Sequence, residues 1–142
     1  MHEHKDHKHG LFEQRGNLLK FAAALWTLSA VFLHFTFPIE FIWYVAIGLS
    51  ISMNTTYPIQ ALSSGRYITK ESAIALALCG CSLLALWWSP LFVIAAIFGH
   101  GVWDLLKLRG AGIGIANWYS AGCFIVDIFY AVSLFLFWID FF

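Results

Sequence analysis

The chain has 142 residues, of which 61% are hydrophobic and only 11% are charged, and its formal net charge is zero. Its mean hydropathy is +0.76, whereas soluble domains are typically about half apolar and about a quarter charged. A water-soluble fold of this composition would have to expose large apolar patches, and a neutral chain offers no basic surface for nucleic acid. The composition therefore predicts a membrane protein whose main partner is the lipid bilayer, with no nucleic-acid partner.

The first 17 residues are polar and predict a His-rich cytoplasmic tail, ending in a short interfacial turn at Leu11 and Phe12. The tail histidines are His2, His4, His7 and His9. Imidazole is a good ligand for zinc, copper and nickel, and a His-rich tract is a compositional sign of metal binding. The tract therefore predicts weak metal binding. A pH-responsive tail and a simply solvated tail are the alternatives, because the histidine spacing is irregular.

Residues 18–142 predict an all-α fold, a polytopic bundle of five transmembrane helices. A spanning helix needs ~20 apolar residues, with a range of about 17 to 25, and proline or polar residues separate the apolar stretches here. The predicted spans are 18–37, 39–62, 71–88, 91–106 and 118–138. Only Ser89 and Pro90 separate the third and fourth stretches. They predict a tight hairpin, because proline disfavours helical conformation at the residue before it.

The positions of the basic residues predict the orientation of this bundle. Lysines and arginines precede the first span, lie between the second and third, and lie between the fourth and fifth. With five spans, all of them fall on one side of the membrane. The positive-inside rule assigns that side to the cytoplasm, so the N-terminus is expected inside and the C-terminus outside.

Three ionisable residues fall within the last two predicted spans. His100 and Asp104 are four residues apart and share one face of the fourth span, and Asp127 lies near the middle of the fifth. An aspartate at the centre of a membrane helix costs about 2.5–3.5 kcal/mol, and such residues usually face the bundle interior. Asp127 is thus a candidate ion or substrate ligand, with His100 as its partner and Asp104 at the entrance. A structural His–Asp pair between two helices is the alternative. For Asp104, which lies close to the headgroups, solvation or a pair with Lys107 or Arg109 is the favoured alternative.

Three weaker candidates accompany this group: Asn54, Tyr57 and Cys123. Asn54 and Tyr57 lie on one stripe of the second span, and Cys123 lies one helical turn before Asp127. Pro58 cannot donate to the carbonyl of Asn54, which predicts a kink beside that residue. For all three candidates, simple packing and hydrogen bonding is the alternative to direct participation in a site.

Residues 99–137 resemble a family of small bacterial integral membrane proteins described as a domain of unknown function. The matching positions are His100, Trp103, Asp104, Trp118, Ser120, Gly122, Cys123 and Asp127. The family pattern has one or two further histidines after Trp-Asp, where this chain has Lys107, and its loop is rich in proline. The resemblance implies that these residues form one unit in the bacterial inner (cytoplasmic) membrane, and it implies no activity.

Three classes of function remain open. The polar residues favour a protein that binds or transports a small cation, a proton or a small polar molecule, with a divalent metal ion as the candidate cofactor. One alternative is an intramembrane enzyme acting on a lipid or isoprenoid, with His100 and Asp127 as general acid and base. No HExxH or GxSxG motif supports that alternative. The other is an accessory subunit of a larger membrane complex. Five spans make a small conduit, so a homo-oligomer or a larger complex is expected.

Overall fold

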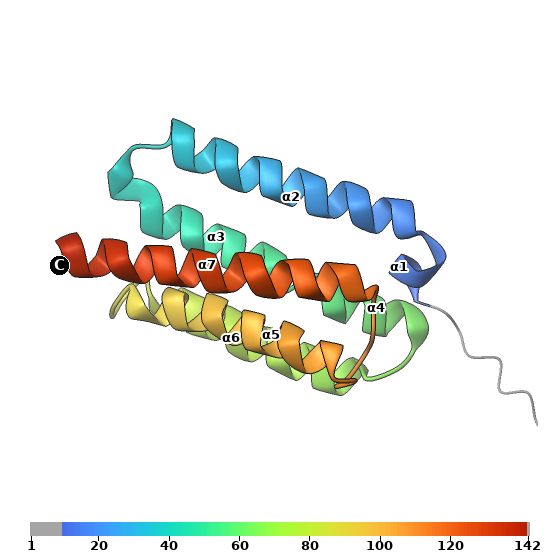
Figure 1. The fold of residues 1–142 in the computed structure, drawn as a ribbon. Coiled ribbons are helices and arrows are strands. Elements are labelled where there is room, and N and C mark those ends of the chain that lie inside the picture. Colours follow the sequence, from blue (N-terminus) through green and yellow to red (C-terminus); the bar gives the residue numbers. More distant parts are fainter. Residues whose placement is uncertain (1–9, 142) are drawn as a thin grey trace, which may run out of the picture.

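In the computed structural model, residues 10–141 are described. Within that range all regular secondary structure is helical, as predicted, with no strand (Figure 1). The elements are α1 (Leu11–Gln14), α2 (Gly16–Thr36), the 3-10 turn η1 (Ile39–Phe41), α3 (Ile42–Met53), α4 (Thr56–Ser64), α5 (Ile68–Leu84), α6 (Leu91–Leu108) and α7 (Asn117–Phe141). The predicted spans thus correspond to α2, to α3 with α4, and to α5, α6 and α7.

Two helix boundaries differ from the bounds of the predicted segments. The tail was predicted to extend to residue 17, but α1 and the start of α2 lie within it, and Phe12 is buried. The backbone N–H of Phe12 donates to Oε1 of Gln60 at 2.9 Å, which fixes α1 against α4. The third span was predicted to reach residue 88, but α5 ends at Leu84 and a turn follows.

Three helices in the described part of the chain are long and apolar enough to cross a membrane: α2, α6 and α7. Large apolar side chains on α2 face outward, and Phe35 is 86% exposed. Contiguous apolar surface of this kind is rare on soluble monomers and suits lipid contact. Membrane-protein class is therefore supported. Five spans and an inward N-terminus stay predictions, because α5 is shorter and α3 and α4 are separate helices.

The second predicted span is broken rather than kinked. α3 ends at Met53, α4 begins at Thr56, and Asn54 and Thr55 lie between them. Pro58 falls in the first turn of α4, where a missing N–H costs no helical hydrogen bond. The proline is therefore accommodated by starting a new helix just before it. Asn54 is 5% exposed, whereas Thr55, the other residue of the break, is exposed.

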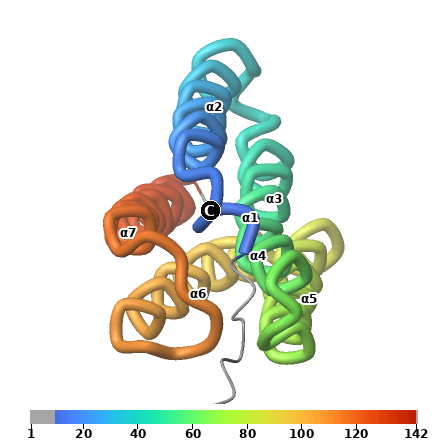
Figure 2. Tube along the Cα trace, turned by 90° about the vertical axis from the view of Figure 1, so that its right-hand side faces the viewer, coloured from blue at the N-terminus to red at the C-terminus, as the bar shows by residue number. Residues whose placement is uncertain are grey.

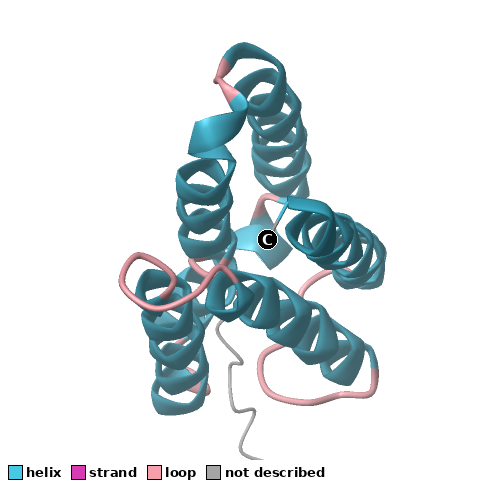
Figure 3. Ribbon diagram, turned by 90° about the vertical axis from the view of Figure 1, so that its left-hand side faces the viewer, coloured by secondary structure: helices cyan, strands magenta, loops and turns pink. Residues whose placement is uncertain are grey.

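The helices pack as a group of four with α2 on one flank. α6 packs between α5 and α7, and α3 contacts both α5 and α6, whereas α2 contacts α1 and α3 (Figure 2). The central apolar core comes from α3, α6 and α7 and consists of Ala46, Ile47, Met53, Val93, Ile94, Ile97, Ala131 and Leu134. Seen from the other end, α2 stands apart from α5 and α6 (Figure 3).

Polar contacts attach α2 to its neighbours. The Nδ1–H of His34 donates to the carbonyl of Ala30 at 2.7 Å, so the Nε2 of His34 accepts from the Tyr130 hydroxyl of α7 at 3.0 Å. Nearer its middle, α2 places the indole N–H of Trp26 2.9 Å from the hydroxyl of Ser52, in α3. These contacts hold α2 beside α3 and α7 although little of α2 is buried.

Candidate functional site

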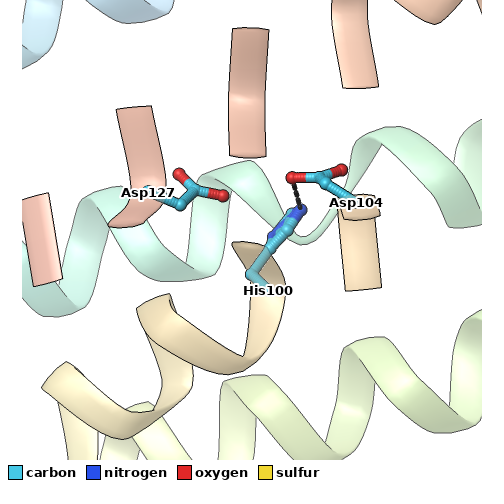
Figure 4. Close-up of side chains that lie close together, drawn as sticks. All are labelled: His100, Asp104 and Asp127. Atoms are coloured by element: carbon cyan, nitrogen blue, oxygen red, sulfur yellow. Dashed lines mark ion pairs between the residues drawn. The ribbon is translucent and has the colours of Figure 1, made fainter. Parts of the chain in front are cut away.

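The last two long helices bring three ionisable side chains together. His100 and Asp104 lie one turn apart on the buried face of α6 and are 4% and 0% exposed, and Asp127 on α7 is 3% exposed. One possible metal-ligand atom from each lies within 4.8 Å of those of the other two (Figure 4). Nε2 of His100 is 3.7 Å from Oδ2 of Asp104. These three residues are called the polar cluster below.

Gly101 allows α7 to approach α6 at the polar cluster. A Cβ atom at position 101 would lie 3.2 Å from the Cβ of Asp127 and 3.2 Å from the Cδ1 of Ile128. Small residues let membrane helices pack closely, and here the absent side chain places Asp127 beside His100. The resemblance pattern did not include Gly101, and its role follows from the packing alone.

Gly101→Val is expected to destabilise the protein by about 1–3 kcal/mol, because the branched side chain would overpack the contact between α6 and α7. The measurement is the free energy of unfolding in detergent. Gly80→Val is the matched control, since Gly80 is also inside a helix and a Cβ there would meet no atom within 4 Å. Equal losses in both variants would show that the close approach at Gly101 contributes nothing.

Two hydroxyl groups, from Tyr57 on α4 and Ser120 on α7, form a hydrogen-bonded chain that ends at Asp104. The hydroxyl of Tyr57, in the first turn of α4, donates to Oδ1 of Asp104. Its oxygen is 2.9 Å from Oγ of Ser120 on α7. Since the Tyr57 proton is given to Asp104, the Ser120 hydroxyl donates to Tyr57. The break before α4 thus places Tyr57 beside the polar cluster. The Tyr57 hydroxyl binds Oδ1 of Asp104 and orients this carboxylate, while Oδ2 of Asp104 has no hydrogen-bond partner.

The polar cluster contains buried atoms that need a further partner. Nδ1 of His100, Oδ2 of Asp104 and Oδ2 of Asp127 have no hydrogen-bond partner and almost no exposed area. Buried polar atoms are satisfied in most proteins, so each such atom calls for an explanation such as an ion. Two neighbouring carboxyl groups also require a compensating proton or cation. The polar cluster therefore has the ligand types of a cation site, and each of its residues has one buried polar atom without a hydrogen-bond partner.

A second buried charge cluster lies beside the first. Glu71 at the start of α5 is 1% exposed and accepts from the Lys107 ammonium on α6. Its Oε1 also accepts from the backbone N–H of Ile113 at 2.7 Å, and its Oε2 from the indole of Trp103 at 3.2 Å. Within residues 10–141, Lys107 is the only buried lysine or arginine. Because Lys107 pairs with Glu71, the polar cluster has no buried lysine or arginine as a counter-ion.

Sequence reasoning did not identify this ion pair. Glu71 was treated as a span boundary, and Lys107 as a marker of the cytoplasmic side or a partner for Asp104. The available signal was two opposite charges at the same end of neighbouring spans. It could not be recognised without knowing that α5 and α6 pack together.

The weaker candidates differ in position. Tyr57 contacts the polar cluster through its hydrogen bond to Asp104. Cys123 lines a cavity whose wall also contains His100 and Asp127. Asn54 is buried, but its side-chain N–H donates to the carbonyl of Ser50, in the last turn of α3, at 2.7 Å, so its contact is local. The predicted metal ligands His2, His4, His7 and His9 lie outside the described residues.

Comparisons with protein-family models, with curated protein sequences and with solved structures found no match. The resemblance to a family of small bacterial membrane proteins therefore stays a prediction. The site must be interpreted from its own chemistry: one imidazole and two carboxyl groups, buried between two apolar helices, with one unpartnered atom on each residue.

Proposed function

We propose that this is an integral membrane protein that binds a divalent metal ion at His100, Asp104 and Asp127, as part of transporting it. The observation that carries the proposal is the group of three buried side chains on two adjacent helices, which bring one possible ligand atom each within 4.8 Å of the others and each keep one unpartnered polar atom. Two carboxylates balance the charge of a divalent ion, and the imidazole adds a ligand of intermediate softness. Such a set suits Zn²⁺ or Mn²⁺ better than a larger, oxygen-preferring Ca²⁺.

Three protein ligands leave at least one coordination position open. In metalloproteins an open position is typical of a site that exchanges a ligand, whereas structural sites are closed by four. Tyr57 would act on the metal indirectly, because its hydroxyl donates to Oδ1 of Asp104 and so orients that carboxylate. Partners of this kind orient the ligands, and their loss typically lowers metal affinity about 10–100-fold.

The same proposal includes five membrane crossings, by α2, by α3 with α4, and by α5, α6 and α7, with the N-terminus in the cytoplasm. The exposed apolar surfaces of α2 and α7 support it. The broken second segment is also compatible, because membrane transporters often place binding sites beside discontinuous helices. Arg66 and Arg109 are exposed, so they support a cytoplasmic position for the two loops that contain them. Lys107 gives no such support, because it is buried and pairs with Glu71. The proposed location is the bacterial inner membrane.

Metal content of the purified protein, produced without a polyhistidine tag, tests the proposed site. After incubation with Zn²⁺ or Mn²⁺ and desalting, we expect about one ion per chain. A deletion of residues 2–9 should retain this ion, which separates the site from the His-rich tail. Asp127→Asn and His100→Gln should lose it, and Tyr57→Phe should bind about 10–100-fold more weakly.

Asp140→Asn is the matched control for this experiment, because Asp140 is an exposed aspartate near the end of the same helix as Asp127. It should bind metal like the wild type. Absence of stoichiometric metal from the wild type, or equal metal in Asp127→Asn and Asp140→Asn, would contradict the proposed site.

Proton binding is a second candidate function for the same residues. It is favoured by the excess of buried carboxyl groups: Glu71 has Lys107 as its counter-ion, whereas within residues 10–141 no lysine or arginine forms an ion pair with Asp104 or Asp127. A wild-type protein that binds no metal, yet takes up protons on reconstitution in a manner lost in Asp127→Asn, would select this candidate.

A further inference from the structure

A cavity of about 830 Å³ lies between α2, α3 and α7. This volume lies within the range of about 300–1,000 Å³ typical of sites for small organic molecules, and it is far larger than a metal ion needs. Its wall includes Leu25, Trp118 and Val126, which are 54%, 49% and 42% exposed. The cavity is therefore open along the flank of the bundle. Because these exposed wall residues are apolar or aromatic, we expect the occupant to enter from lipid and not from water.

The cavity follows from the sparse attachment of α2. Only 6% of the residues in the most apolar stretch of this helix are buried. Two hydrogen bonds join it to its neighbours, from Trp26 to Ser52 on α3 and between His34 and Tyr130 on α7. The side chains of α2 do not fill the space that faces α3 and α7, so a molecule that fills this space would complete the packing of α2.

The lining differs between the two ends of the cavity. At the end formed by the last turn of α2 and the start of α3 it is aromatic, with Phe37, Phe41 and Tyr44. Toward the other end, where α2 and α7 both begin, it includes the hydrogen-bonded pair Thr56 and Tyr119 (Figure 1). A molecule with a long hydrocarbon chain and a polar head group therefore fits best with its head near the starts of α2 and α7.

Two cationic side chains lie beside that end. Lys20 is exposed and precedes Ala23 by three residues and Thr27 by seven, and both of these line the cavity, so Lys20 shares their face of α2. Side chains on a helix lean toward its N-terminus, so the Lys20 ammonium is expected to extend past the cavity toward the head groups. Arg15, just before α2, is also exposed. Within residues 10–141, neither Lys20 nor Arg15 forms an ion pair.

The opposite end of the bundle has the opposite charge. Glu40, in the 3-10 turn, and Asp140, near the end of α7, are both exposed there. Every lysine and arginine of the described residues belongs to the end where α2 and α7 begin. An anionic head group is therefore attracted to the end of the cavity beside Lys20 and repelled from the other end.

The length of the cavity suits one lipid chain. Ala22 and Phe37 line its two ends and are 15 residues apart, which corresponds to about 22 Å along α2. The hydrocarbon core of a bilayer is about 30 Å thick, so the acyl layer of one leaflet is about 15 Å deep. A complete acyl chain can thus lie in the cavity while its head group stays at the membrane surface.

From these observations we propose that the cavity binds one acyl chain of an anionic phospholipid, with the phosphate beside Lys20 and Trp118 and the chain along α2 and α3. An ammonium group and a phosphate form a charge-assisted hydrogen bond, and tryptophan is favoured at the level of lipid head groups. The proposal goes beyond the metal site and does not depend on it. His100 and Asp127 contribute to the wall, but their unpartnered atoms are buried, and the lipid is not assigned to them.

Two glycines allow the chain site to be blocked. Gly48 on α3 and Gly122 on α7 both line the cavity, and a Cβ at either position would meet no atom within 4 Å. Gly48→Leu and Gly122→Leu should therefore fold and occupy space that the acyl chain needs. Gly80→Leu is the matched control, because Gly80 has equally open surroundings inside α5 and does not line the cavity.

One lysine allows the head-group site to be tested separately. Lys20→Gln removes the cation beside the polar end of the cavity and leaves the chain site unchanged. Lys70→Gln is its matched control, because Lys70 is an exposed lysine at the same end of the bundle, on α5, which does not line the cavity.

The experiment uses phosphatidylglycerol with a diazirine at the end of one acyl chain, added to the purified full-length protein in a neutral detergent. We expect saturable cross-linking to peptides of α2, α3 or α7. Unlabelled phosphatidylglycerol should compete about tenfold or more better than phosphatidylcholine or oleate. Gly48→Leu and Gly122→Leu should each weaken binding about tenfold, and Gly80→Leu should not. Lys20→Gln should reduce the preference for phosphatidylglycerol over phosphatidylcholine about fivefold, and Lys70→Gln should leave it unchanged.

Several results would overturn the proposal. Equal competition by phosphatidylcholine would show unselective lipid contact, and equal competition by oleate would show a fatty-acid site. Cross-links confined to α5, or unchanged binding in both glycine variants, would exclude the cavity. If both glycine variants fail to fold, as judged by gel filtration, the Lys20→Gln and Lys70→Gln pair decides, and equal preference in these two variants overturns the head-group site. Metal content of the same wild-type sample tests the metal site independently, because neither result alters the expectation for the other.

Discussion

Glu71→Leu is expected to lower the free energy of unfolding by about 3–5 kcal/mol, because it leaves the buried Lys107 ammonium without a counter-ion. The variant also removes the acceptor for the backbone N–H of Ile113 and for the indole of Trp103. Since Ile113 belongs to the connection between α6 and α7, the loss would loosen the segment that positions both helices of the polar cluster. The measurement is unfolding in detergent with increasing denaturant.

Glu40→Leu is the control, because Glu40 is exposed at the start of the 3-10 turn and should tolerate the change. The double variant Glu71→Leu with Lys107→Met gives a second test. It should lose less stability than the sum of the two single variants, because it removes both buried charges. Glu71→Leu and Glu40→Leu of equal stability would show that the buried ion pair does not hold this end of the bundle.

Gly112→Ala is expected to be strongly destabilising for two separate reasons. Its φ of +63° lies in the left-handed region, where a non-glycine residue costs about 1–2 kcal/mol. In addition, a Cβ there would overlap Oε1 of Glu71 and lie 2.8 Å from Nζ of Lys107. The overlap should add about 1–3 kcal/mol, because the buried ion pair must be displaced.

Gly110→Ala separates these two effects. Gly110 lies in the same connection with a φ of +89°, but a Cβ there would meet no atom within 4 Å. It should therefore lose only the backbone contribution, and the difference between the two variants measures the clash with Glu71 and Lys107. The same detergent unfolding assay applies. A Gly110→Ala variant as unstable as Gly112→Ala would mean that only backbone conformation matters in this connection.

Features that depend on neighbouring residues could be predicted from the sequence. Long apolar stretches predicted the helices, because each helical hydrogen bond joins residues four apart and lipid contact demands apolar side chains. The spacing of His100 and Asp104 placed both on one face of α6 for the same reason. Pro58 predicted an interruption at Asn54, and α3 ends one residue before it.

Features that join distant segments were decided by the tertiary structure. Asp127 lies beside His100 only because Gly101 lets α6 and α7 pack closely. Glu71 and Lys107 are 36 residues apart, and Tyr57 reaches Asp104 across 47, so no local pattern could pair them.

The cavity likewise arises from where α2 lies against α3 and α7. By itself, the sequence of this protein determined an apolar, all-helical chain with three costly ionisable residues in its last two long helices. Only packing determined that those residues form one cluster with unpartnered atoms, since helix–helix contacts depend on side-chain shape over the whole bundle.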